Sequence, residues 1–263
     1  MEIVKNIKDK ITDYFYSGSQ TEEPTLTASD PNDVLDICFL LDITGSMGSY
    51  IQMMGKCLND LVFYFSSTFA PKKVYMSFVG YRDFGDNDQF VIEDFANIDM
   101  KNVLKSSIYQ RIKNIKVFGG GDFPEDIRGA IKHALKLKWR SMNKFVVLIA
   151  DAPTHGKRYC ENCGDGYPNE DIQDAIEELM KRKIGFIGVE FATGTDKMYK
   201  ELAEIYRQKG MEIYFALENM KELSKENKDL DERVRRFMDL IATKVKETMF
   251  RIFNYHKKQN LLP

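Results

Sequence analysis

The chain has 263 residues, which suits one large domain or one domain with appendages. Its 38 Lys and Arg residues are balanced by 40 Asp and Glu residues, and the formal net charge of −2 excludes the strongly basic footprint of a nucleic-acid-binding domain. Three histidines leave little room for a His-rich metal site or a His-based catalytic triad.

The first 33 residues (1–33) are predicted to form an appendage. Glu2–Ser17 carries apolar residues at helical spacing with lysines between them, the pattern of a short amphipathic helix. Ser17–Asp33 is polar and contains two prolines, which is typical of a linker. Because no signal segment opens the chain and no apolar stretch is long enough to span a bilayer, we expect a cytoplasmic protein without a transmembrane segment, in a reducing environment.

Strands and helices are predicted to alternate over residues 34–217. The expected strands are Val34–Leu41, Val74–Arg82, Phe90–Phe95, Phe145–Ala150, Ile184–Ala192 and Glu212–Leu217. The expected helices are Ser46–Phe69, Met100–Ile112, a helix from Glu125 or Asp126 to Leu137, Asp171–Lys183 and Met198–Lys209. Nearly continuous apolar strands that alternate with helices imply an α/β fold with a parallel sheet covered on both faces.

The last segment, residues 218–263, is mostly one predicted helix, Leu230–Phe253. Apolar side chains recur on one stripe of it, and basic side chains form another face that acidic residues dilute. The basic face is suited to an acidic membrane or a partner's groove. We favour packing of the apolar stripe on the domain or on the N-terminal helix.

Oxygen-bearing side chains gather in three loops that follow predicted strands. Asp42, Thr44 and Ser46 share the first loop, Asp122 follows a run of glycines in the second, and Asp151 opens the third. Ligands of such sheets bind beyond the carboxyl ends of the strands, and oxygen ligands suit Mg²⁺ or Mn²⁺, with Ca²⁺ possible. Singly, Ser46 and Asp122 could each be a helix cap. Their combination at three strand ends favours a metal site.

Several motifs carry a resemblance to a known family. The stretch "DITGS" at Asp42–Ser46 resembles the D-x-[ST]-x-S signature of von Willebrand factor type A domains. "FVGYRDFGD", "GGGDFPED" and "ADAPTHG" together are most similar to the A domains beside atypical alpha-kinase catalytic domains, although nothing in the chain resembles the kinase domain itself. The resemblance covers roughly Val34 to Leu217. It implies a doubly wound, Rossmann-like, mostly parallel sheet with one antiparallel edge strand and flanking terminal helices.

The resemblance also implies a metal-ion-dependent adhesion site. In this family the two hydroxyls of the first loop, here Thr44 and Ser46, bind the cation directly. Asp42 acts directly or through water, and Asp151 often through water. Where the integrin-like branch has a threonine in the middle loop, this chain has Asp122, with Glu125 as the alternative ligand. An extra carboxylate would partly neutralise the ion and weaken its attraction for a partner's carboxylate.

The function that follows is a non-enzymatic, intracellular adhesion or scaffold module, whose Mg²⁺ is completed by an Asp or Glu of a protein partner. One alternative is a structural subunit of a larger assembly, held by contacts through its terminal helices. The other is a metal-dependent hydrolase, since Mg²⁺ with carboxylates also serves phosphoryl transfer. The sequence shows no credible nucleophile–base pair, and the resemblance argues against an enzyme.

A further loop, "HGKRYCENCGDGYP", holds His155, Cys160 and Cys163. Cys-x-x-Cys can be half of a zinc site, with Asp165 as a possible fourth ligand. A single such pair is a weak signal, and we favour two reduced thiols.

Three acids also cluster in "YRDFGDNDQF", namely Asp83, Asp86 and Asp88. One use of such a run is to hold a second cation next to the first. A solvated turn between strands is the commoner use and is the one we favour.

Overall fold

The computed structural model describes residues 34–48, 51, 73–97, 107–190, 192–221 and 230–259. The predicted helix Glu2–Ser17, the linker Ser17–Asp33, most of the predicted helix Ser46–Phe69 and the first half of Met100–Ile112 lie outside these ranges.

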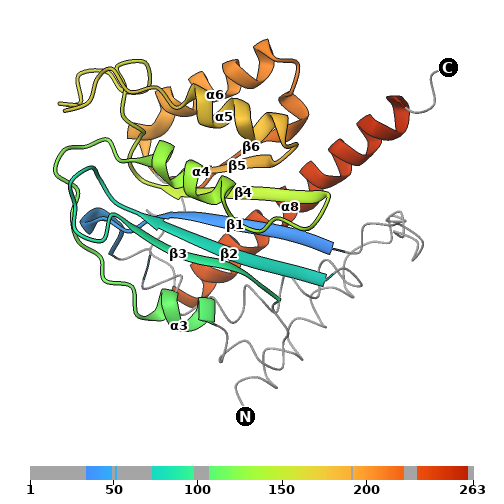
Figure 1. The fold of residues 1–263 in the computed structure, drawn as a ribbon, viewed down its shortest axis with the longest axis horizontal. Helices are drawn as coiled ribbons and strands as arrows, with labels where there is room; N and C mark the ends of the chain where they lie inside the picture. The colour runs from blue at the N-terminus through green and yellow to red at the C-terminus, as the bar shows by residue number, and fades with distance from the viewer. Residues whose placement is uncertain are drawn as a thin grey trace. The chain divides into compact units, whose positions relative to one another are not determined.

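Six strands form one sheet in the order β3-β2-β1-β4-β5-β6 (Figure 1). Their bounds are Val34–Asp42 (β1), Lys73–Tyr81 (β2), Phe90–Asn97 (β3), Asn143–Ala150 (β4), Gly185–Glu190 (β5) and Phe215–Asn219 (β6). Every neighbouring pair is parallel except β2 and β3. The predicted doubly wound, mostly parallel sheet with one antiparallel edge strand is therefore confirmed.

Helices cover both faces of this sheet (Figure 1). They are α3 (Ser107–Lys113), α4 (Ile127–Leu135), α5 (Gln173–Lys181), α6 (Asp196–Gln208) and α8 (Leu230–Gln259). Ile37 and Phe39 of β1 belong to the core beneath α3 and α8, whereas Cys38 and Leu40 belong to the core beneath α4, α5 and α6. Since successive side chains of a strand point to opposite faces, burial on both sides explains why β1 is apolar throughout.

The last strand begins later than its sequence indicated. Glu212–Tyr214 forms a short 3₁₀ turn, and β6 starts only at Phe215. The residues before β6 turn the chain back after the end of α6. At this turn the backbone N–H of Met211 donates to the carbonyl of Tyr206 at 2.9 Å. Tyr214 is buried in this turn. Its apolar character therefore reflects burial in the turn and not membership of a strand.

The C-terminal helix α8 packs on the sheet, as its apolar stripe indicated, and extends beyond the predicted end at Phe253 to Gln259. Phe237, Ile241 and Val245 of this stripe are fully buried in the core shared with β1 and β5. This spacing of four residues keeps them on one side of the helix. Among the residues that the structure describes, no helix combines the length and apolar content needed to cross a membrane.

Shortening a buried side chain at the centre of α8 is expected to destabilise the domain. Ile241→Ala should lower the free energy of unfolding by about 2–5 kcal/mol, because it leaves a cavity between helix and sheet. Chemical denaturation measures this loss. Phe250→Ala on the same helix is the control, since Phe250 is 46% exposed and should change stability much less. Equal effects would mean that α8 does not anchor the core.

The arrangement of the strands places two predicted site loops side by side. The chain runs outward from β1 to β2 and β3 and then returns to β4, on the other side of β1. The strand order therefore reverses between β1 and β4, which is where ligands bind in open α/β sheets. Asp42 ends β1 and Asp151 follows β4, so both carboxylates lie at this point.

Candidate metal centre

A chain of hydrogen bonds joins the first and third predicted loops. The backbone N–H and the hydroxyl of Thr44 both donate to Oδ1 of Asp42, at 2.9 and 2.6 Å. The hydroxyls of Thr44 and Ser46 are 3.3 Å apart, and Ser46 Oγ donates to Oδ1 of Asp151 at 3.1 Å. The structure thus brings these four residues together, and the Ser46 hydroxyl contacts a carboxylate of the neighbouring loop.

The carboxylate of Asp42 is completely buried, yet its Oδ2 atom has no hydrogen-bond partner. Burial raises the pKa of Asp42 to about 7, against hydrogen bonds from Thr44 that lower it, and the charge of Asp151 adds to the rise. The pKa of Asp151 is raised as well, chiefly by burial. Two neighbouring carboxyls without a cation between them disfavour each other's charged form.

The glycines of the middle loop allow it to approach the Asp42 loop closely. Gly119 and Gly120 have positive φ angles of 86° and 88°, which glycine adopts without strain. The N–H of Gly45 donates to the carbonyl of Gly119 at 3.3 Å. Asp86 accepts from the N–H of Gly120 at 3.0 Å, so the β2–β3 turn holds the glycine run in place. A Cβ on Gly119 would collide with Asp86.

Glu125 is the middle-loop acid that lies beside Thr44. A Cβ at Gly120 would be 3.0 Å from Oε1 of Glu125 and 3.4 Å from Cβ of Thr44, so both side chains border the same glycine. The N–H of Glu125 donates to the carbonyl of Pro153 at 2.9 Å, which ties the middle loop to the loop after β4. Its side chain is buried, and Oε2 has no hydrogen-bond partner. Burial, followed by the charge of Asp42, raises its pKa to about 10.

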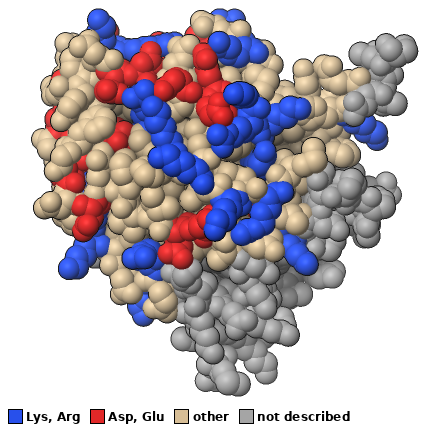
Figure 2. Space-filling model, in the orientation of Figure 1, with Lys and Arg blue, Asp and Glu red and all other residues tan. Residues whose placement is uncertain are grey.

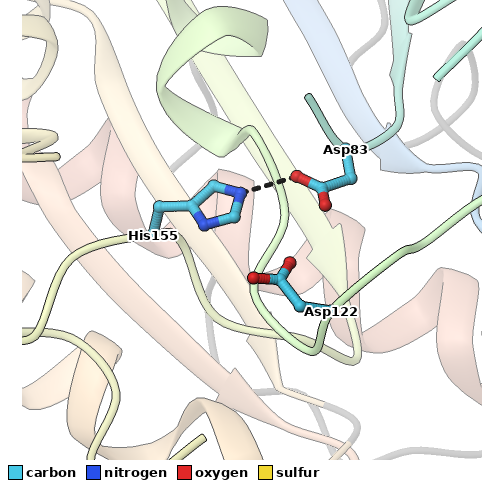
Figure 3. Close-up of side chains that lie close together, drawn as sticks. All are labelled: Asp83, Asp122 and His155. Atoms are coloured by element: carbon cyan, nitrogen blue, oxygen red, sulfur yellow. Dashed lines mark hydrogen bonds and ion pairs between the residues drawn. The ribbon is translucent and has the colours of Figure 1, made fainter. Parts of the chain in front are cut away.

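Asp122 lies in a different, neighbouring group. One ligand atom each from Asp83, Asp122 and His155 lies within 4.8 Å of the others (Figure 3). Oδ2 of Asp122 accepts from the N–H of Gly166 at 2.5 Å. The structure therefore assembles Asp42, Thr44, Ser46 and Asp151 of the predicted set and places Asp122 elsewhere. The cap of α4 is neither Asp122 nor Glu125 but Asp126, which accepts from the N–H of Gly129.

His155 bridges two aspartates instead of joining the cysteines of its loop. Its Nε2 is 2.6 Å from Oδ1 of Asp83, and its Nδ1 is 2.9 Å from Oδ1 of Asp165. Burial lowers the pKa of His155, but its hydrogen bonds to Asp165 and Asp83 outweigh that effect, and the net shift is upward. Cys160 and Cys163, expected as reduced thiols, are joined in a disulfide, with their Cα atoms 6.0 Å apart. They are therefore close enough to bond to one another.

The acidic run after β2 forms the turn that its sequence favoured. Asp88 has a φ of 49°, a left-handed conformation that Asp tolerates better than most residues. Asp86 is occupied by the backbone N–H groups of Gly120 and Asp83. Asp83 alone points into another group, toward His155, a partner 72 residues away in the sequence.

The residues around Asp42 fit a hard divalent cation. They supply only oxygen atoms, from two hydroxyls and from carboxylates, which is the donor set that Mg²⁺, Mn²⁺ and Ca²⁺ prefer. Two buried carboxylate oxygens, Asp42 Oδ2 and Glu125 Oε2, lack any hydrogen-bond partner. A buried polar atom without a partner costs free energy, and a bound cation would remove that cost.

Two curated proteins are similar to this chain in sequence. Alpha-protein kinase vwkA of Dictyostelium discoideum is 25% identical over 217 residues, which is 80% of this chain and 33% of that protein. A putative ariadne-like RING finger protein, R811, of Acanthamoeba polyphaga mimivirus is 27% identical over 142 residues, 54% of this chain and 13% of that protein. The chain thus spans a third or less of the length of these relatives.

Solved structures share the fold at low sequence identity. The pilus adhesin SpaC of Lactobacillus rhamnosus GG, in its open conformation, has a TM-score of 0.54 at 11% identity, covering 84% of this chain and 30% of that one. The PilB minor pilin of Streptococcus sanguinis has a TM-score of 0.51 at 11% identity, covering 85% and 63%.

A family model decides the assignment. The model of the von Willebrand factor type A domain matches residues 36–229, which include β1 from Asp36 onward, the other five strands and the three predicted site loops. This confirms the resemblance seen in the sequence motifs. The chain belongs to the von Willebrand factor type A domain family.

Proposed function

We propose that this chain is a non-enzymatic protein-binding module whose binding depends on one Mg²⁺ ion, with Mn²⁺ or Ca²⁺ as substitutes. The ion would be held by Asp42, Thr44, Ser46 and Asp151, with Glu125 in the middle-loop position. The observation that carries this proposal is the pair of buried, unpartnered carboxylate oxygens of Asp42 and Glu125 beside two hydroxyls at the switch point of the sheet. Membership of the family supports a protein-binding role.

The surface around the site supports a protein as the partner. Three aromatic side chains are exposed on the loops that carry the site or the neighbouring group around His155. They are Phe118, Phe123 and Tyr167, with exposed fractions of 37%, 44% and 45%. Exposed aromatic side chains around a polar centre are typical of protein–protein contacts. In the proposed complex the partner contacts these rings, and one of its Asp or Glu side chains completes the coordination of the ion.

The charge of the described surface supports the same choice of partner. On the face in Figure 2, Lys and Arg side chains lie among Asp and Glu side chains. In the described part of the chain, oppositely charged side chains also form ion pairs, as Arg128 does with Glu170 at 2.9 Å and with Asp174 at 2.8 Å. A strongly positive surface would favour nucleic acid, whereas recognition of a partner through a single bound ion needs no such surface. An intracellular location is part of the proposal.

Metal removal is expected to abolish partner binding. A pull-down from the native cell should lose its specific partner in EDTA and recover it on addition of excess Mg²⁺. Asp42→Ala should lose the partner in the presence of Mg²⁺, while Asp174→Ala, a surface ion-pair variant, should retain it. Retention of the partner both in EDTA and by Asp42→Ala would show that the ion site is not the interface. A Mg²⁺-dependent phosphatase activity lost in Asp42→Ala would show instead an enzyme.

A further inference from the structure

The group formed by Asp83, Asp122 and His155 shares no residue with the oxygen site around Asp42. We propose that it binds a second divalent cation, a transition metal of the Zn²⁺ class, through one imidazole nitrogen and two carboxylate oxygens. The three side chains come from the turn after β2, the glycine-rich loop and the loop after β4. Figure 3 shows the Asp122 carboxylate facing the space between the imidazole and Asp83. This proposal stands independently of the Mg²⁺ site.

The imidazole has the orientation of a metal ligand, and a bound cation would replace the proton through which Nε2 contacts Asp83. Asp165 holds Nδ1 at 2.9 Å, so Nε2 faces Asp83. Asp165 is itself fixed by the N–H groups of Gly156 and Tyr167, both at 2.7 Å. A carboxylate on the far nitrogen is the usual outer partner of a metal-binding histidine, because it sets the tautomer and the ring orientation.

The two carboxylates leave an acceptor unused. Oδ2 of Asp122 accepts from the N–H of Gly166, while Oδ1 is buried without a hydrogen-bond partner. Asp83, whose side chain is 6% exposed, accepts from the N–H of Phe84 at 2.6 Å and from His155. A cation beside Oδ1 of Asp122 would satisfy this atom and separate the two negative charges.

Distances and surroundings suit an ion of this class. Zn²⁺ binds nitrogen and carboxylate oxygen at about 2.0–2.2 Å, so its ligand atoms lie about 3–3.5 Å from one another. The three atoms lie within 4.8 Å already, and small side-chain rotations would close the remainder. Phe84 stacks on the imidazole at 4.9 Å between ring centroids, and Tyr167 meets it edge-on at 5.0 Å. These two rings pack against the imidazole and help to fix its orientation. An imidazole ligand favours Zn²⁺ over Mg²⁺.

Zn²⁺ titration of the full-length chain by calorimetry tests the proposal. The Cys160→Ser, Cys163→Ser double variant serves as the background, so that thiols cannot bind the metal. Asp122→Asn should weaken Zn²⁺ binding at least about 10-fold, and the positioning variant Asp165→Asn about 10–100-fold. His133→Gln, which removes another of the three histidines, should leave the affinity unchanged.

Two further measurements keep the test decisive. Because His155→Gln is at a buried position and could unfold, Co²⁺ absorption provides a second readout: the visible bands of protein-bound Co²⁺ should appear in the background protein and disappear in Asp122→Asn. Asp42→Ala should keep Zn²⁺ affinity within about threefold of the background, so a failed Mg²⁺ site and a failed Zn²⁺ site are distinguishable. Absence of Zn²⁺ binding to the background, or equal binding by Asp122→Asn, would mean that His155 only bridges two aspartates.

Discussion

Replacing Asp42 with asparagine is expected to reduce Mg²⁺ affinity at least about 100-fold, equivalent to roughly 3 kcal/mol of binding free energy. Oδ1 of Asp42 organises the loop by accepting two hydrogen bonds from Thr44, and Oδ2 is the buried atom without a partner. An amide of the same size removes the negative charge and one of the two oxygens. Calorimetric titration with Mg²⁺ measures the loss, and circular dichroism verifies that the fold is retained.

A pair of matched variants separates the two middle-loop acids. Glu125→Gln should weaken Mg²⁺ binding, because Glu125 borders the same glycine as Thr44. Asp122→Asn should leave Mg²⁺ affinity within about threefold, because Asp122 belongs to the group around His155. The opposite ranking of these variants would favour Asp122, the middle-loop ligand predicted from the sequence, over Glu125.

The metal-free domain is expected to lose stability as the pH rises from 5 to 8. Burial raises the pKa of Asp42 from 3.8 to about 7 in the folded chain. A carboxyl with a raised pKa stabilises the fold while protonated, so its contribution is complete below about pH 4 and is lost as the pH rises through about 7. For Asp42 the upper bound of this loss is about 4 kcal/mol. Glu125, with a pKa near 10, and His155, also raised, act in the same direction.

Urea denaturation at pH 5 and pH 8, in EDTA and in Mg²⁺, measures this effect. Mg²⁺ binds the deprotonated carboxylates, so it should restore stability mainly at pH 8, by about 2.7 kcal/mol at a concentration 100 times its Kd. Asp42→Asn should reduce both the pH dependence and the gain from Mg²⁺. A metal-free protein that becomes more stable toward pH 8 would contradict the account. Groups with lowered pKa values, such as Asp165, finish titrating below this range.

The sequence predicted the elements whose signals are local. The apolar run of β1 is buried on both faces, and the carboxylates that follow β1 and β4 meet because parallel neighbours end at the same edge. The pattern of apolar and polar residues along the chain directly predicts the order of the elements and the burial of the strands. The stripe on α8 likewise indicated a packed helix. The proximity of Asp42 and Asp151 followed from these rules alone.

The sequence could not distinguish Asp122 from Glu125, which are three residues apart in one loop. Their placement depends on the path of the backbone, which is set by glycines at positive φ and by the hydrogen bond from Glu125 to Pro153. The glycine run is visible in the sequence, but the backbone path it takes and the hydrogen bond of Glu125 are not. The contact of His155 with Asp83, across 72 residues, is equally invisible without the fold. The sequence showed Asp86 only as one of three acids in a turn. Its contact with the backbone N–H of Gly120 is known only from the structure.

The most direct measurement is anomalous diffraction from a crystal of this chain grown with Mn²⁺ as the substitute for Mg²⁺. We expect an anomalous peak within ligand distance of the Ser46 and Thr44 hydroxyls, adjacent to Asp42 and Asp151, and no such peak in a crystal of Asp42→Asn. A wild-type crystal at the same Mn²⁺ concentration without a peak between these four residues would contradict this expectation.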